Sequence, residues 1–460
     1  MAKNLVESYK NRLAISESVY QKSHNGARMS SQKKLMIAAV LDNTARFLNE
    51  AMDSTAATQR TALGDYKKFA LNVTTVALPN LILPELMLTQ PMSSLAGYVT
   101  YLRYQAGTDK GGVSVDQTFN GVYGLGKMDE FRANYTSSFV VEPVGAEDVE
   151  CVLAWTPVEG TVYGIAANGT KTPLTPSNGK VTFTAGTYVK VAYQYNNEII
   201  PQASEPNSLP TLKAKLASIN LHAHARRIAV YYSQIAAFQA KNDYGFDLGQ
   251  QLAAQAQGEL AYEIDTEGVL MLSKGAEHDT SLDIKSFDDY QTSSVNGTYI
   301  SRSQYYEVIS EKVAKAKAII YNRTQKFAPN YMVCGSNVLT VLPYVKGWVA
   351  APAANVNGPY FAGTLDSLKV FVSPAIDPNE FFFGVNGSDL QTSAAIYAPY
   401  MAIVPTQLLG FADGNMSQGF STMYDMKLLS TYNGTAANPV EVADGDVGEF
   451  SWLLVKGALV

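Results

Sequence analysis

The chain has 460 residues, four histidines, two cysteines and a net charge of −6. Single cores rarely exceed about 250–300 residues, so this length predicts two or three folding units. The negative charge argues against a dedicated nucleic-acid-binding protein. Two cysteines far apart in the sequence argue against a disulfide framework.

The composition favours a surface that packs against other copies of the chain. Charged residues make up 17% of the chain and tyrosines number 28, whereas about 25% charged residues is usual. Because the chain has no run of 18 apolar residues, we expect no membrane span. The first residues lack the apolar stretch of a secretion signal, so we expect synthesis and folding in a cytoplasm.

The first fifty residues differ from the rest. They hold eight Lys or Arg and four Asp or Glu, a net charge of +4, which predicts a separate role for them. Residues 1–29 are polar and weakly patterned. From Ser30 the spacing predicts an amphipathic helix that docks on the body, a neighbouring copy or an assembly factor. Its apolar face comprises Ile37, Val40, Leu41, Phe47 and Leu48.

A long hairpin is predicted in the first half of the chain. Residues 74–84 form a proline-bounded apolar segment, and residues 98–104 have the composition of a strand. Residues 106–138 are rich in glycine, which favours a long surface loop or arm. Residues 217–226 alternate as a two-faced strand that can pair with the outgoing side of this arm.

Residues 139–200 are predicted to form a unit of their own within that arm. Short β-type runs recur there, with the turn signals Asn168-Gly169 and Asn178-Gly179 between them. Five short strands in about 60 residues predict a small β-sandwich or barrel. The runs span residues 139–141, 149–153, 161–163, 181–184 and 188–193.

The longest element is predicted at residues 246–273, after a short helix at 228–241. An apolar residue recurs at every fourth position, which places one stripe on a helix about 40 Å long. It is either a long core helix or a strut on which sheets and loops are hung. The stripe comprises Leu248, Leu252, Ala256, Leu260 and Ile264.

Residues 280–460 are predicted to mix helices with short strands. Residues 303–326 have helical spacing, and a strand at 331–334 and a helix near 336–344 follow. The predicted apolar face of the 303–326 helix comprises Tyr306, Ile309, Val313, Ala316 and Ile320. Further strands are expected at 368–373, 380–385, 394–404, 420–430 and 449–455.

Few residues suggest chemistry. His222 and His224 share a strand face but are too few for a metal site, and Asp288-Asp289 lies in a polar loop where solvated charge is expected. Gly111-Gly112 and Gly121-x-x-Gly124-x-Gly126 lack the strand, helix and lysine of a phosphate-binding loop. We therefore predict no catalytic, cofactor-binding or metal-binding residues, and a structural or assembly protein rather than an enzyme.

Two features concern covalent changes. Cys334 follows an apolar run and is predicted to be buried. Cys151 lies in a β-like stretch, and the sequence leaves undecided whether it forms a disulfide with another chain. At the end of the basic helix, Leu48-Asn49-Glu50-Ala51 combines an apolar residue, any residue, Glu and a small residue. This is a plausible protease site between Glu50 and Ala51, although such tetrads also occur by chance.

Several segments occur in the order known from one family. Pro79-Asn80-Leu81-Ile82 and Gln90-Pro91-Met92-Ser93-Ser94 open the body, and the run from Ala225 to Ile264 matches a lead-in and a long helix. Together the segments resemble the major capsid proteins of T-even-type bacteriophages over roughly residues 44–430. The later landmarks are Ser336-Asn337-Val338, Phe382-Phe383-Gly384-Val385, Tyr397-Ala398-Pro399-Tyr400 and Gly419-Phe420.

The resemblance implies the Hong Kong 97 capsid fold, an α+β fold. It has an N-terminal arm, an extended loop, a peripheral domain with a spine helix, and an axial domain. On this chain the arm is 1–73, and the peripheral domain starts at 74–104 and resumes at 228–279 with the spine helix at 246–273. The extended loop is 105–227 with a β-sandwich-like insertion domain at 139–200, and the axial domain with the return to the peripheral domain is 280–460.

The resemblance also implies a function. The chain would be the major capsid protein of a tailed bacteriophage, assembling as hexamers into the icosahedral head that encloses the DNA genome. Implied partners are other copies, vertex or portal proteins, a scaffold, decoration proteins, and packaged double-stranded DNA held without sequence-specific contacts. No cofactor and no membrane are implied.

The resemblance further implies trimming by a prohead protease between Glu50 and Ala51. Assembly would take place in the cytoplasm of the bacterial host, and the chain would end up in the virion. The alternatives are a pentameric vertex paralogue of the capsid protein, a β-rich cell-surface adhesin and, third, an enzyme.

Overall fold

The computed structural model comprises two compact units, Met1–Tyr101 with Ser218–Val460, and Leu102–Ala217. The residues that the structure describes are 2–23, 28–53, 71, 75, 78–108, 115–116, 140–153, 157–194, 211–243, 245, 248–287, 301–324, 327–351, 358–406, 409–411, 413–429, 431–435, 438–441 and 448–460.

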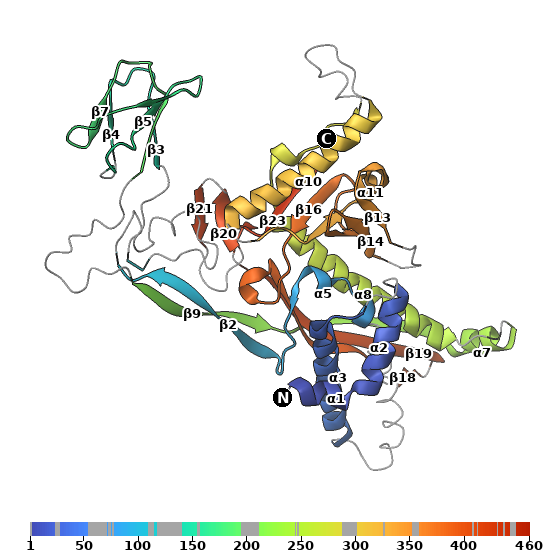
Figure 1. The fold of residues 1–460 in the computed structure, drawn as a ribbon. Helices are drawn as coiled ribbons and strands as arrows, with labels where there is room; N and C mark the ends of the chain where they lie inside the picture. Colours follow the sequence, from blue (N-terminus) through green and yellow to red (C-terminus); the bar gives the residue numbers. More distant parts are fainter. Residues whose placement is uncertain are drawn as a thin grey trace. The chain divides into compact units, whose positions relative to one another are not determined.

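A five-stranded sheet carries the long helix of the first unit (Figure 1). The strand order is β1–β17–β19–β10, and β18 also pairs with β19. The strands are β1 (Leu88–Thr89), β10 (His224–Ser233), β17 (Ala395–Pro405), β18 (Leu409–Gly410) and β19 (Asn415–Leu428). Helix α8 (Leu248–Lys274) packs on one face of this sheet through Ala253, Ala256 and Leu260, which meet Ile403 and Phe420.

Helix α8 confirms the predicted long helix but shifts its apolar stripe. Ala256, Leu260 and Ile264 are buried, whereas Leu248 and Leu252 are only half-buried. The buried stripe continues through Val269 and Leu272. Gly268, directly before Val269, lets the short helix α5 (Leu83–Leu86) approach, since a Cβ there would lie 2.3 Å from Leu83 Cδ2.

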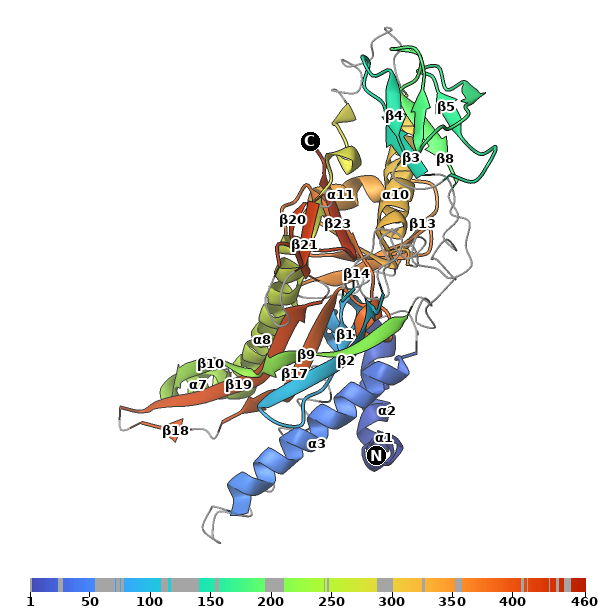
Figure 2. The same ribbon diagram turned by 90° about the vertical axis from the view of Figure 1, so that its left-hand side faces the viewer.

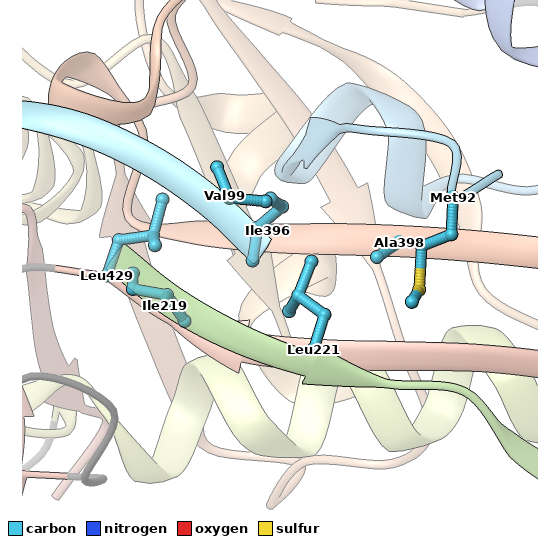
Figure 3. Packing of buried hydrophobic residues seen from close by; sticks show 7 residues of the cluster. All are labelled: Met92, Val99, Ile219, Leu221, Ile396, Ala398 and Leu429. Atoms are coloured by element: carbon cyan, nitrogen blue, oxygen red, sulfur yellow. The ribbon is translucent and has the colours of Figure 1, made fainter. Parts of the chain in front are cut away.

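The opposite face of the sheet is covered by a β-ribbon. Strands β2 (Ala96–Ala106) and β9 (Leu212–His222) pair with each other. Figure 3 shows Val99 of β2 together with Ile219 and Leu221 of β9 around Ile396 and Ala398 of β17. The seven buried residues of this cluster are Met92, Val99, Ile219, Leu221, Ile396, Ala398 and Leu429.

The first fifty residues are helical throughout most of their length. Helices α1 (Ala2–Ser8), α2 (Lys10–Ser23) and α3 (Ser31–Asp53) succeed one another. Helix α3 was expected, but α1 and α2 were not, because residues 1–29 carry little helical pattern. Leu13, Ser16 and Tyr20 of α2 are nevertheless buried, so packing rather than local preference stabilises this helix.

The expected helix at 228–241 is wrong in its first half. Strand β10 continues to Ser233, and helix α7 (Gln234–Asp243) begins only after it. Ten residue pairs join β10 antiparallel to β19, from His224 with Tyr424 to Ser233 with Asn415. This long-range pairing overrides the local helical preference of the segment.

A seven-stranded mixed sheet forms the other part of the first unit, with strand order β11–β23–β16–β12–β15–β14–β13. Its strands are β11 (Glu277–His278), β12 (Tyr331–Cys334), β13 (Trp348–Ala350), β14 (Tyr360–Leu365), β15 (Leu368–Val372), β16 (Glu380–Gly384) and β23 (Leu454–Ala458). Helices α10 (Arg302–Thr324) and α11 (Ser336–Val341) belong to this part, and β20 (Thr431–Thr435), β21 (Asn438–Glu441) and β22 (Phe450–Ser451) form a small separate sheet.

Helix α10 buries nearly the predicted face. Ile309, Val313, Ala316 and Ile320 are buried, but Tyr305 rather than Tyr306 completes the stripe. The Tyr306 ring instead stacks on Tyr344 at a centroid distance of 5.2 Å. Short one-turn 3₁₀ segments occur at Leu78–Asn80, Thr280–Leu282, Leu342–Tyr344 and Leu390–Thr392.

Between residues 140 and 193 of the second unit, the described residues form six short strands in two small sheets. One has the order β3–β8–β5–β6, and the other pairs β4 with β7. The strands are β3 (Val140–Pro143), β4 (Glu150–Val152), β5 (Tyr163–Ile165), β6 (Lys171–Pro173), β7 (Lys180–Thr182) and β8 (Lys190–Tyr193). Residues 140–193, called the β-unit below, bury their own core of Cys151, Leu153, Val162, Val181, Val191 and Tyr193.

The protein is thus an α+β protein with two main sheets in the first unit and a small two-sheet β-unit in the second. Among the described residues, no helix is long and apolar enough to span a membrane. The glycine-rich stretch expected to form a loop at 106–138 lies almost wholly outside the described residues.

Candidate assembly surfaces

Helix α3 lies along strand β17 of the five-stranded sheet (Figure 2). Leu48 is 2% exposed and packs with Met401 and Val404 of β17. The Asn43 amide donates hydrogen bonds to the carbonyl oxygens of Met92 (2.6 Å) and Tyr400 (3.0 Å). The contact therefore combines apolar burial with a polar anchor. We call the surface of β17 and its neighbours that receives α3 the α3 groove.

A buried ammonium group fixes the start of α3. The Lys33 Nζ atom donates to the Leu81 carbonyl oxygen at 3.1 Å and lies 4.6 Å from the centre of the Tyr20 ring. Burial lowers the pKa of Lys33 to about 8, opposed by the negative charges of Glu85 and Asp265. A lysine buried this way must be compensated by its surroundings.

The compensation comes from two carboxylates of the body. The Asp265 carboxylate on α8 accepts the backbone N–H groups of Ile82 and Leu83. Burial raises its pKa to about 7, although these hydrogen bonds and the Lys33 charge act in the opposite direction. The Glu85 carboxylate accepts hydrogen bonds from the Tyr20 hydroxyl (2.7 Å) and from the Lys369 ammonium (3.0 Å).

Two further positive charges of the basic segment form ion pairs within it. Lys34 pairs with Glu17 at 2.9 Å, and Arg46 pairs with Asp42 at 3.2 Å. Part of the positive charge that suggested a separate role therefore lies in contacts within the molecule. Lys34 pairs with Glu17 of α2, and Lys33 bonds to Leu81 of the body. Residues 2–53 form part of the first unit rather than a free arm.

The predicted processing residues lie inside α3. Glu50 is exposed, and both Glu50 and Ala51 belong to the helix, which ends at Asp53. The predicted apolar face is correct for Ile37, Val40, Leu41 and Leu48 but wrong for Phe47, which is 43% exposed. Phe47 comes directly before Leu48 and points away from the groove because neighbouring helical residues differ in direction by about 100°.

A second surface carries several large apolar side chains that are exposed to solvent. Tyr231 at the end of β10, Ile235 and Phe238 on α7, and Leu409 and Phe411 next to β19 are all 49–71% exposed. Strand pairing brings them together in the fold: Tyr231 and Leu409 both oppose Ser417 of β19. Phe411 and Gln234 are tied to the same turn through Asn415 and Gly414. We call these five apolar residues the tip surface.

A cleft of about 490 Å³ lies between the second half of α8 and strands β10 and β19. Its wall carries a salt bridge between Arg226 and Glu267 at 2.6 Å, and the Tyr424 hydroxyl also donates to Glu267. The Glu267 hydrogen bond raises the pKa of Arg226. Lys274 and Asp425 also line the cleft, so its lining carries charges of both signs.

The other residues singled out in the sequence do not form a site. His222 ends β9 and His224 begins β10, so they belong to different strands, and both are exposed. Asp288-Asp289 and the glycines at 111–112 and 121–126 lie outside the described residues. In the part of the chain that the structure describes, no group of three or more His, Cys, Asp or Glu could hold a metal ion.

Both cysteines are free and buried. Cys334 is fully buried in β12, as expected, and burial raises the pKa of its thiol to about 12. Cys151 is 7% exposed in the core of the β-unit, where burial and the carboxylates of Glu142 and Asp148 raise the pKa of its thiol. Because the thiolate is the reacting species, the raised pKa makes both thiols less reactive in this fold.

These elements define the class of the protein. A helical N-terminal segment, a β-ribbon leading to a separate unit, a long helix on a sheet and a second mixed domain make up the Hong Kong 97 capsid fold. The model of the family described as major capsid protein Gp23 matches residues 63–449. The chain therefore belongs to the Gp23 major capsid protein family, and it is a major capsid protein of a tailed bacteriophage.

Individual relatives and solved structures are also similar to this chain. The major capsid protein of Enterobacteria phage T4 is 22% identical over 398 residues, covering 79% of this chain and 75% of that protein. The major capsid protein of Enterobacteria phage T6 is also 22% identical and covers 79% and 78%. The structure titled "The capsid of Myoviridae Phage XM1" has a TM-score of 0.37 at 9% identity over 56% of this chain and 81% of that chain. One titled "Mycobacterium phage Che8" has 0.33 at 12% identity over 56% and 76%.

The family decides among the sequence-based alternatives in favour of a capsid protein over an adhesin. The capsid family is a structural one, and a chain of this family assembles with its own copies into a shell. The sequence analysis missed the burial of Lys33 near the carboxylates of Glu85 and Asp265. The available signal was Asp265 itself, a charged residue next to Ile264 in the buried stripe of the long helix.

Proposed function

We propose that this chain assembles as hexamers that tile the icosahedral head around the double-stranded DNA genome. The observation that supports this most directly is the tip surface, because large apolar side chains in contact with water favour association. Burying one such side chain is worth about 1.5–3 kcal/mol. Many weak contacts of this kind become strong when each subunit makes several at once.

We further propose how the parts of the chain divide the work. Residues 1–73 are the N-terminal arm, 74–104 and 228–279 belong to the peripheral domain, and 280–460 form the axial domain with the return to the peripheral domain. Residues 105–227 are the extended loop with the insertion domain at 139–200. The separate compact unit at Leu102–Ala217, with a core of its own, supports this division.

The proposed partners follow from the family rather than from a site. They are vertex or portal proteins, a scaffold, decoration proteins and a prohead protease that cuts between Glu50 and Ala51 in the host cytoplasm. The DNA is held without sequence-specific contacts, which the net charge of −6 supports, since a strongly basic wall would bind DNA tightly.

Assembly of the purified full chain tests the proposal. We expect the wild-type chain to form large rings or closed shells by electron microscopy and sedimentation velocity. The double variant Ile235→Lys with Phe238→Lys places two charges in the tip surface and should leave small species. Ala236→Lys adds a charge to a third exposed position of α7 and serves as the matched control.

The outcomes separate two claims. If the double variant assembles as the wild type does, the tip surface is not an interface between subunits. If the wild-type chain forms no large particle under any assembly condition, the proposal of a self-assembling hexamer is wrong. Circular dichroism of each variant establishes that a loss of assembly is not a loss of fold.

A further inference from the structure

The Glu50–Ala51 bond lies in a folded helix whose N-terminal side is packed on the body. Three residues of α3 follow the bond, Ala51 to Asp53, and two residues before Glu50 the Leu48 side chain is buried against Met401 and Val404. An endoprotease needs several residues around the cut in extended form, so cleavage occurs from locally opened states. In the docked state this bond is therefore protected although Glu50 itself is exposed.

The protection is strengthened by contacts far from the bond. Ile37, Val40 and Leu41 are fully buried along the preceding turns, and the Asn43 amide bonds two carbonyl groups of the body. Near the helix start, Lys33 is enclosed by the Leu81 carbonyl and the Tyr20 ring. Since these contacts hold one continuous helix, they all act against opening of its end.

We infer that docking of α3 in its groove gates processing of the chain. The Glu50–Ala51 bond is protected while α3 is docked and becomes cleavable when the end of α3 leaves β17. This inference rests on the proposed processing after Glu50, and it adds a regulatory step that the motif alone does not contain.

The same contacts predict what happens after the cut. Residues 31–50 keep the Lys33 anchor, the Asn43 hydrogen bonds and most of the buried face, so cleavage by itself does not release the segment. The N-terminal fragment stays bound to the body until the groove contacts are broken. Release of the basic helix therefore requires both cleavage and undocking.

Limited digestion of the full chain with a glutamate-specific endoprotease tests the gate without the phage protease. The Glu159–Gly160 bond is an internal reference, because both residues are exposed in a turn of the β-unit. In the wild type we expect cutting at Glu50 to be at least about tenfold slower than at Glu159. The two rates are read from the same reaction by mass spectrometry.

Two variants loosen the dock at different distances from the bond. Leu48→Ala removes the buried side chain nearest to it, and Ile37→Ala removes a fully buried side chain 13 residues upstream, where it cannot touch the protease. We expect each to raise the Glu50 rate by about tenfold or more, since large-to-small changes in a core cost several kcal/mol. Phe47→Ala is the matched control for Leu48→Ala, because Phe47 is the exposed neighbour.

The results decide the inference whatever becomes of the capsid assembly. Slow cutting at Glu50 that accelerates in Leu48→Ala and Ile37→Ala, with Phe47→Ala and the Glu159 rate unchanged, supports the gate. Equal cutting at Glu50 and Glu159 in the wild type overturns it, even if a variant fails to fold. Loss of the N-terminal fragment on gel filtration of the cut wild-type chain contradicts the predicted retention.

Discussion

The N-terminal helices and the β-unit bury their apolar side chains in different places. Helix α3 places Leu48 against β17 and inserts Lys33 near carboxylates of α5 and α8, so its partners are distant in sequence. The core of the β-unit is built only from its own residues, 144–193, around Val181, Val191 and Tyr193. In the unassembled chain, removing α3 therefore exposes the apolar surface of its host, whereas removing the β-unit exposes none of the first unit's core.

Deleting each region gives the largest expected difference. Replacing residues 140–193 by a short Gly/Ser linker is feasible because Val140 and Tyr193 are paired neighbours. We expect the unfolding temperature of the remainder to change by less than about 4 °C. Deleting residues 1–50 from the unassembled chain uncovers the α3 groove and removes the Lys33 charge near the buried Asp265. We expect this to abolish cooperative unfolding, since removing the compensating charge of a buried group costs about 3–5 kcal/mol.

Thermal unfolding followed by circular dichroism distinguishes the two deletions. The comparison fails if the chain lacking residues 1–50 still unfolds cooperatively near the wild-type temperature. It fails equally if removal of the β-unit destroys the first unit.

A substitution in the β-unit core should have a strong but local effect. Tyr193 is fully buried and its hydroxyl donates to Glu142, so Tyr193→Ala should cost about 3–5 kcal/mol and open this small unit. Hydrogen exchange should rise in residues 140–193 and stay unchanged in α8. The control Val189→Ala, at an exposed position of the same unit, should leave exchange as it is. Faster exchange in α8 would mean that the β-unit supports the first unit after all.

Asp265 should make the anchoring of the N-terminal helices depend on pH. Its pKa is raised by burial to about 7 in the fold, from an ordinary value near 3.8. The fold therefore binds a proton more readily than the unfolded chain. The stability that this provides is complete below about pH 4 and is lost as the pH rises through 7.

We expect this group to lower the free energy of unfolding by roughly 1–4 kcal/mol between pH 4 and pH 8. Urea unfolding across that range should show a smaller decrease for Asp265→Asn. Glu263→Gln changes an exposed carboxylate on the same helix and serves as the control. An unchanged slope in Asp265→Asn would show that the carboxylate titrates alike in the folded and unfolded chain.

Two glycines of α8 provide the smallest and most closely matched test. Gly268→Ala drives a Cβ into Leu83, which positions α5 beside Lys33, and should destabilise by about 1–3 kcal/mol. Gly258→Ala meets no atom within 4 Å and should stabilise by up to about 1 kcal/mol through helix preference. Urea unfolding measures both. If the two changes have the same sign, the close packing of α5 on α8 is not a stability determinant.

Periodicity predicted the elements whose apolar face is repeated over several turns or strands. The long helix and the 303–326 helix were recognised in this way, and most β-unit strands came from alternation between turn signals. The family resemblance then supplied the fold, which periodicity alone does not. These predictions succeeded because local pattern and tertiary packing agree at positions such as Leu260 and Ile320.

The misses occur where distant contacts decide the local structure. Residues 228–233 became a strand because β19, nearly 200 residues away, pairs with them. Helix α2 is stabilised by burial of single residues such as Leu13 and Tyr20, too sparse to form a visible stripe. Lys33 looked like one of several surface charges, and only the fold brings it near Glu85 and Asp265.

Hydrogen–deuterium exchange of the intact, unassembled chain tests most directly whether residues 31–53 belong to the core. We predict that amides of α3 between Lys33 and Leu48 exchange as slowly as those of α8 between Ala253 and Leu272, because both helices pack on the same sheet. Exchange of the α3 amides within seconds, with α8 still protected, would show instead that the segment is a loosely attached arm. That result would contradict both the packing of α3 into the core of the first unit and the protection of the Glu50–Ala51 bond by this docking.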